Sequence, residues 1–335
     1  MDRDFALMTA GPCMELPRLR HDRLLTTTED LEVYDSRCYV PRSGYKDREG
    51  PTVTEVVIPR RGVFAAHGCG KEILGNVGCV VLIGAHEDYS VAHPGADWHA
   101  YTYLRVHAAV IEESFGPMRF AARSLDRAQM LAVSLIANSM RSGQWDDLEA
   151  EELAMLLLAA VVNSFGTPER STAARVGAQR TKRIQRICAM LAAAPTEHWR
   201  LQSIGRQVAC SPFHLARDFR AVTGETIGRY LLRLRLGVAL DRVAGGAEDL
   251  AALASDIGFA HHSHFTYRFH QAFGLTPTDA RRLLSERRLE AFRVLLSRSA
   301  PTQADARGGS DAVCAKRWRP HVALATGGQT SATPS

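Results

Sequence analysis

The sequence lacks an apolar run long enough to cross a bilayer. The longest one, Leu153–Val162, covers ten residues, whereas a membrane-spanning helix needs roughly 20. The N-terminal stretch MDRDFALMTAGPC carries acids where a signal peptide has basic residues, and it holds no apolar segment of about 7 to 15 residues. We therefore expect a cytoplasmic protein with no membrane partner.

Paired cysteines are also missing. Seven cysteines are spread over the chain without any C-x-x-C pair, which is typical of reduced thiols in a reducing compartment. A structural zinc site needs closely spaced thiolates or imidazoles, so we predict no metal and no cofactor. Cys188 and Cys210 are interpreted as small buried hydrophobes, with a thiol-based redox sensor as the alternative. The cysteines are Cys13, Cys38, Cys69, Cys79, Cys188, Cys210 and Cys314.

The chain has little net charge, +5 over 335 residues, but that charge is unevenly divided. Residues 1–180 hold 19 basic and 24 acidic side chains, whereas residues 181–285 hold 14 basic and 8 acidic ones. A basic segment joined to an acidic one indicates a polyanion such as nucleic acid as the partner of one half only. The length and the 46% hydrophobic content are sufficient for two domains.

Residues 31–107 have the pattern of short β-strands. Val, Ile, Tyr and Phe are concentrated in a few segments with turn residues between them. In the last segment Tyr101, Tyr103 and Arg105 alternate with Thr102, Leu104 and Val106, a period of two. Strands at this spacing favour a barrel or a sandwich. The segments are Glu32–Val40, Thr52–His67, Cys79–Ile83 and Ala100–His107.

The period changes to that of helices between Ser124 and Phe165. One apolar helix is predicted around Leu125–Ile136 and a second over Leu148–Val162. Their wide apolar faces need a partner, either the underside of the chain's own barrel or a second copy of the chain, and we favour the dimer interface. Residues 166–179 are polar and suit a linker. Beyond Ser297 the sequence is polar and aperiodic, and we expect disorder there.

The basic half contains one structural unit twice. Leu201, Ile204, Gly205 and Val208 have the same offsets, 0, 3, 4 and 7, as Leu250, Leu253, Ala254 and Ile257. After a break that is one residue longer in the second unit, Leu215 and Phe219 correspond to Phe265 and Phe269. A small residue where two short helices cross, a tight turn and a second helix are the content of a helix-turn-helix. The second helices are expected to be capped by Ser211–Pro212 and near His262–Ser263.

Helical geometry separates the faces of these second helices. At 100° per residue, Leu215, Phe219 and Val222 face inward in the first unit, as Phe265, Phe269 and Ala272 do in the second. The outward side chains offer hydrogen bonds to base edges and phosphates. Arg217 is the first choice for reading a base, because arginine binds guanine in a bidentate manner. The outward residues are Phe213, His214, Arg217 and Arg220 in the first unit and Ser263, Tyr267 and His270 in the second, with His262, Thr266 and Arg268 toward the edges.

Residues Ile227–Arg242 predict one helix between the two units. Its sixteen residues span about 24 Å at 1.5 Å per residue. Such a rod would hold the two second helices apart, and we expect them to match consecutive major-groove faces, about 34 Å apart. A single chain would then read two adjacent segments of double-stranded DNA.

From about Arg183 to Leu284 the chain resembles the DNA-binding domain of the AraC/XylS family of bacterial transcription regulators. The resemblance implies a seven-helix domain and recognition positions at Phe213, Ala216 and Arg217, then His262, Ser263, Thr266 and Tyr267. The family often has arginine where Tyr267 stands, proline at Ile227 and an aromatic residue at Ala280. The matching segments are SPFHLARDF (211–219), YLLRLRL (230–236), IGF (257–259), SHF (263–265), Phe269, FGLTP (273–277) and Arg281.

The acidic half resembles the cupin-like sensory domain that many members carry before two dimerisation helices. The similar segments are TEVVIPRRGVFAAH (54–67) and VAHPGAD (91–97). Metal-dependent cupins use an H-x-H pair with a downstream glutamate, and the histidines here do not provide it. We therefore expect an organic effector or a protein signal. The histidines are His67, His86, His93, His99 and His107.

The resemblance implies an α+β architecture: a cupin-like β-barrel with two following helices, a linker, and an all-α domain with two helix-turn-helix units. The predicted boundaries are 1–115 for effector sensing, 116–165 for dimerisation, 166–180 for the linker, 181–285 for DNA binding and 286–335 for a helical extension and tail. An effector held in the barrel would alter how the helices and linker present the DNA-binding domain. We predict an effector-responsive activator that acts as a homodimer with RNA polymerase.

Other functions are disfavoured by what the sequence lacks. A metal-dependent cupin enzyme fused to a DNA-binding domain would need the missing metal ligands, and an alkyl-transfer repair enzyme would need a four-cysteine zinc cluster. The crowding of His261, His262, His264 and His270 suits a DNA-facing surface better than a metal site. An architectural DNA-compacting protein would not need the sensor-like first half. We expect no enzymatic activity.

Overall fold

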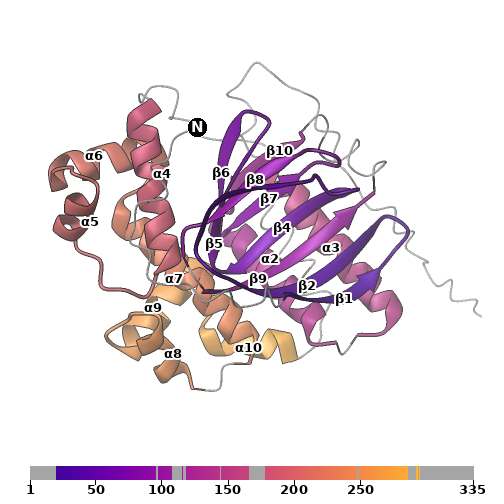
Figure 1. Ribbon diagram of the computed structural model, residues 1–335. Coiled ribbons are helices and arrows are strands. Elements are labelled where there is room, and N and C mark those ends of the chain that lie inside the picture. Colours follow the sequence, from indigo (N-terminus) through magenta and orange to yellow (C-terminus); the bar gives the residue numbers. More distant parts are fainter. Residues whose placement is uncertain are drawn as a thin grey trace, which may run out of the picture.

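The computed structural model describes residues 20–285, apart from 96, 108–114, 116–117, 144, 166–177 and 247–248, together with 292 and 294. Within these residues ten strands come first and the long helices follow. The strands and helices are also seen in Figure 1, and the α+β class is confirmed. We call residues 20–165 the sheet half and residues 178–285 the helical half. Most of the predicted linker and the predicted tail lie outside the described residues.

The sheet half contains two antiparallel sheets. The six-stranded sheet has the order β1-β2-β9-β4-β7-β10, and the four-stranded sheet has the order β3-β8-β5-β6. The strands are β1 (Arg20–Thr27), β2 (Leu31–Val40), β3 (Ser43–Arg48), β4 (Thr54–Arg61), β5 (Val63–Gly68), β6 (Lys71–Asn76), β7 (Cys79–Ile83), β8 (Tyr89–His93), β9 (Asp97–Val106) and β10 (Phe120–Ser124).

The four predicted strand segments are all present, with one of them divided. The predicted segment 52–67 is two strands, β4 and β5, because Gly62 between them has a φ of +86° that turns the chain. In β9, Thr102, Leu104 and Val106 are fully buried and Tyr101 and Arg105 are half-buried, so burial follows the period of two except at Tyr103, which is 8% exposed. The strands that sequence reasoning missed include β1 and β3, whose charged, exposed edge positions carry little apolar signal.

The helix α2 (Arg127–Arg141) contacts helices of both the sheet half and the helical half. It begins in a capping box, in which Asp126 and Gln129 exchange side-chain to backbone hydrogen bonds. Residues 129–140 are buried on all sides except at Ser134. They pack against α3 (Asp147–Phe165) and against helices from the other half. The apolar faces of α2 are therefore covered within one chain.

The helical half has the seven helices that the resemblance implies. They are α4 (Ala178–Ala193), α5 (Leu201–Gln207), α6 (Pro212–Thr223), α7 (Ile227–Ala244), α8 (Leu250–Asp256), α9 (His262–Phe273) and α10 (Pro277–Ser285). The helix α4 begins three residues inside the segment predicted as linker. The central helix α7 runs two residues beyond the predicted end, because Val243 is still fully buried. Among the described residues no helix is long and apolar enough to cross a membrane.

Two hydrophobic clusters divide the helical half unequally. One continuous cluster joins the large sheet, α2 and α3 to α7, α8 and α9. A second cluster contains α4, α5, α6 and the first half of α7, with Val63 of β5 as its buried contribution from the sheet half. The second helix-turn-helix unit therefore shares its core with the sheet half, whereas the first has a core largely of its own.

The two units, α5–α6 and α8–α9, have the same turn. The backbone N–H of Cys210 donates to the carbonyl of Gly205 at 2.9 Å, and that of Phe259 donates to the carbonyl of Ala254 at 2.9 Å. Each turn contains one residue with positive φ, Ala209 in the first and Gly258 in the second. A Cβ atom on Gly205 would lie 2.5 Å from the carbonyl oxygen of Cys210. The first unit thus needs glycine where the second accepts alanine.

Gly205→Ala is expected to destabilise the protein by about 1 to 3 kcal/mol, because the added methyl group overlaps backbone that does not move freely. Gly228→Ala is the matched control, since a Cβ atom on this helical glycine would meet no atom outside its own helix within 4 Å. That control should be stabilised by about 0.5 kcal/mol. Urea unfolding followed by circular dichroism measures both. Equal effects of the two substitutions would contradict the close crossing of α5 with its turn.

Candidate nucleic-acid interface

The helix α6 presents the face that the sequence predicted. Leu215 and Phe219 are fully buried and Val222 is half-buried. Arg217 is exposed and Phe213 is 74% exposed, although it is a large apolar side chain. The other predicted contact residues on this helix, His214, Ala216 and Arg220, are exposed as well. One face of α6 is thus free for a partner.

The start of α6 is fixed by local hydrogen bonds. The Ser211 hydroxyl accepts a hydrogen bond from the backbone N–H of His214 at 3.4 Å and lies 2.8 Å from Nδ1 of the same residue. Pro212 occupies the first turn, where its missing N–H costs nothing. The helix ends at Gly224 in the left-handed region. These contacts confirm the predicted cap and orient His214 at the exposed end of the helix.

The helix α9 buries Phe265, Phe269 and Phe273. It exposes His262, Ser263 and His270, and Tyr267 is 60% exposed. Two of the predicted contact residues, Thr266 and Arg268, are both half-buried. The N-cap is His261, one residue before the predicted position, and its side chain makes no capping bond.

Two polar contacts support these faces. Nε of Arg217 lies 3.6 Å from the carboxylate of Asp218, which is 6% exposed, so the guanidinium is held near the helix surface. Arg268 donates to the side-chain oxygen of Gln271 at 3.2 Å. Sequence reasoning missed both Asp218 and Gln271 as supports of the face. Asp218 directly follows Arg217, and Gln271 lies three residues after Arg268. These positions were the signal that the sequence offered.

The two exposed faces belong to different ends of the helical half. Figure 1 shows α7 running between the pair α5–α6 and the pair α8–α9. At 1.5 Å per residue the 18 residues of α7 span about 27 Å. The bases that each face would contact, and the match to consecutive major grooves, stay predictions.

One of the crowded histidines packs against an aromatic ring, and two of the cysteines are buried. The ring of His264 packs edge-on against Phe259 with 5.5 Å between ring centroids. Among the described residues, no three His, Cys, Asp or Glu side chains gather so as to hold a metal ion. Burial raises the pKa of Cys79 to about 11 and that of Cys188 to about 12, which disfavours the reactive thiolate. Cys210 is half-buried, and Cys13 and Cys314 lie outside the described residues.

A family model described as a helix-turn-helix domain matches residues 204–283, which include both exposed faces. The regulatory protein SoxS of Salmonella typhimurium is 30% identical over 81 residues, which are 24% of this chain and 76% of SoxS. The family-model match falls on the helical half, where the repeated unit lies.

Longer relatives match with lower identity. An uncharacterised HTH-type transcriptional regulator of Escherichia coli, YidL, is 22% identical over 241 residues, 70% of this chain and 77% of YidL. The HTH-type transcriptional activator RhaR of Salmonella dublin is 26% identical over 137 residues, 41% of this chain. That match spans 49% of RhaR, about half its length.

Proposed function

Because the chain belongs to the AraC/XylS family of transcriptional regulators, we propose that it reads two adjacent major-groove segments of double-stranded DNA. The chain is a DNA-binding transcriptional regulator, and the finer statement concerns how it binds. The single observation that carries it is the repeated unit. Both α6 and α9 bury one apolar face and present a polar, partly aromatic face outward. Two such helices, joined by α7, suit contacts with two consecutive major-groove segments of one DNA duplex.

The proposed contacts divide into those that specify sequence and those that position the protein. Arg217 has the best chemistry for a bidentate contact with a guanine. Phe213, Ala216 and Tyr267 would contact bases or thymine methyl groups, with Ser263 and Thr266 as hydrogen-bonding partners of base edges. His214, Arg220 and Arg268 would bind phosphates, and His262 would contact a base edge, as the family resemblance implies. The excess of basic residues in 181–285 supports this polyanionic partner.

The homodimer is proposed to form through α3 rather than through α2. Leu148, Met155 and Val162 are spaced by seven residues on α3, which places them on one line along the helix. Leu148 is 72% exposed, and Met155 and Val162 are half-buried. The helix α2 does not offer such a stripe, since its apolar faces are covered within the chain. The proposed dimer interface therefore contains α3 and not α2, although the sequence predicted that both helices would take part.

Regulation is proposed to run from the sheet half to the DNA. The sheet half would bind an effector and thereby change the presentation of the helical half, and the DNA-bound protein would activate transcription by contacting RNA polymerase in the cytoplasm. The relative RhaR is described as an activator, which supports the sign of this regulation. No catalytic role is proposed.

Arg217→Ala is expected to cost about 1 to 3 kcal/mol of DNA-binding free energy and to relax specificity at one base pair. The cognate sequence is first selected from a random pool of duplexes with the full chain. Fluorescence anisotropy then compares selected and scrambled duplexes at one fixed salt concentration. Arg119→Ala is the control, because Arg119 is an exposed arginine of the sheet half. Wild-type affinity and specificity of the Arg217 variant would show that the assigned face is wrong.

Met155→Asp is expected to convert the dimer into a monomer, because it places a charge in the middle of the α3 stripe. Analytical ultracentrifugation over a range of concentrations gives the dissociation constant, which should rise by at least about a hundredfold. Leu201→Asp is the matched control, because Leu201 is a 43% exposed apolar residue on α5, away from α3. A Met155 variant that dimerises as well as wild type would refute α3 as the interface.

A further inference from the structure

One arginine of α7 contacts both helix-turn-helix units. Arg235 donates from Nε to the carbonyl of Pro195 at 2.8 Å and from Nη2 to the carbonyl of Glu197 at 2.9 Å. Both acceptors lie in residues 194–200, the α4–α5 loop, which leads into the first unit. From Nη1, the same side chain donates to the carbonyl of Gly258 at 3.0 Å, in the turn of the second unit. A single guanidinium group therefore connects the two units.

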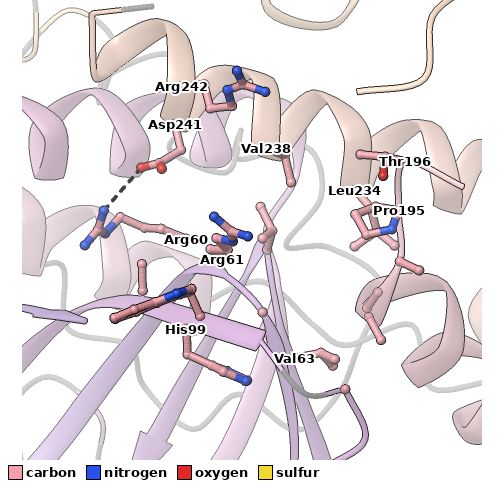
Figure 2. Close-up of a pocket in the computed structure, with 18 of the residues that line it drawn as sticks. Arg60, Arg61, Val63, His99, Pro195, Thr196, Leu234, Val238, Asp241 and Arg242 are labelled. Carbon is pink, nitrogen blue, oxygen red and sulfur yellow. Dashed lines mark ion pairs between the residues drawn. The ribbon is translucent and has the colours of Figure 1, made fainter. Parts of the chain in front are cut away.

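The α4–α5 loop and the turn of the second unit also approach each other closely. Gly258 has a φ of +83°, and a Cβ atom there would lie 2.8 Å from the carbonyl oxygen of Thr196 and 2.9 Å from Cζ of Arg235. Figure 2 shows Pro195 and Thr196 of this loop next to Leu234, the residue that precedes Arg235 on α7. The backbones of the loop and of the turn therefore lie against each other at Arg235.

The α4–α5 loop is attached to the core of the first unit. The indole N–H of Trp199 donates to the carbonyl of Ala194 at 2.8 Å, which closes the loop on itself. The ring of Trp199 packs against the hydrophobic cluster that contains Phe219 of α6. A contact that fixes the position of this loop therefore also fixes the position of α6.

The apolar cores of the two units are separate on either side of Arg235. Leu234 is buried in the cluster of the first unit, whereas Leu236 is buried in the cluster that contains the second unit. Because the units pack around different apolar residues, this packing does not by itself set the angle between them. Arg235 lies between Leu234 and Leu236 and is bonded to both units, so it is suited to set that angle.

We propose that Arg235 is a positioning residue that sets the distance and the angle between α6 and α9, and thereby the spacing of the two DNA segments that the chain accepts. The inference rests on the proposed function and adds the residue that determines the spacing. The guanidinium group is planar and its donors point in fixed directions. Three carbonyl groups from two segments of the chain therefore hold it in one orientation.

The spacing of the DNA segments reports this geometry. One base pair inserted between them moves the second segment by about 3.4 Å along the duplex and turns it by about 35° around the axis. Two units held at one angle cannot follow both changes, whereas units without the Arg235 contacts can adjust. A residue that only stabilises the fold would change the amount of folded protein, but it would not change which spacing the folded protein prefers.

Binding of the full chain to duplexes of altered spacing tests this role. The preferred sequence is selected from a random pool of duplexes, and substitution of each base pair locates the two segments. One base pair is then inserted or deleted between them, and fluorescence anisotropy gives the dissociation constants at one fixed salt concentration. Wild type should bind both altered duplexes at least about tenfold more weakly than the selected one, because one set of base contacts is then misplaced.

Arg235→Gln should reduce this difference to about threefold or less and weaken binding to the selected duplex, because the units are no longer preorganised for one spacing. Arg235→Lys keeps the charge but not the fork of donors and should fall between Arg235→Gln and wild type. Cooperative thermal melting checks folding, and Arg235→Lys keeps the test decisive if Arg235→Gln does not fold. Arg242→Gln is the control, because Arg242 is another arginine of α7 and contacts the second unit through an exposed ion pair with Asp256 at 2.9 Å. It should keep the spacing preference of wild type.

The outcomes separate this inference from the proposed function. If wild type and the Arg235 variants prefer one spacing equally strictly, or if wild type reads two segments at any spacing, the role of Arg235 is refuted and the proposed function stands. Loss of the spacing preference in Arg242→Gln would also overturn the role, because it would not be particular to Arg235. A wild type that reads one segment only, or no sequence at all, would refute the proposed function and the inference with it.

Discussion

The packing of α7 against α2 is the contact on which the rest of the structure depends. Leu236, Leu240 and Val243 of α7 are buried in the same cluster as the apolar residues of α2. The close approach continues toward the sheets, because a Cβ atom on Gly237 would lie 2.5 Å from the side chain of Val77. Asp241 of α7 also forms ion pairs with Arg60 of β4 and Arg141 of α2. The apolar residues of α7 and α2 that are buried together supply the association of the two halves.

Because of that contact, the two helix-turn-helix units differ in how they pack against the sheet half, although their own architecture is the same. The second unit shares the central core through Phe265, Phe269 and Leu253, and Arg127 of α2 reaches the backbone of Gln271 on α9. The first unit packs around its own buried Phe219, and α4, which packs against α6, contacts β5 and β6 of the sheet half. The sheet half is therefore packed more directly against α9 than against α6. In the proposed function, α6 would keep reading its DNA segment while the second contact is adjusted.

Local repetition made the helical half predictable from sequence, and long-range contacts limited what could be predicted elsewhere. The spacing of Leu201, Ile204 and Gly205 and its repetition at Leu250, Leu253 and Ala254 define helices, turns and faces through neighbours along the chain. Asp241 has no such signal. It is one acidic residue on a long helix, and its partners Arg60 and Arg141 come from a strand and a helix far away in sequence. The missed strand β1 and the burial of residues 129–140 of α2 likewise depend on distant segments.

Native-state hydrogen exchange of the full chain tests the coupling between α7 and α2 most directly. If the second unit belongs to the central core, buried amides of α8 and α9 should exchange with the same free energy of opening as those of α2. Amides of α5 and α6 should exchange through a separate, less costly opening. Exchange of all four unit helices together, at an opening energy different from that of α2, would contradict the account.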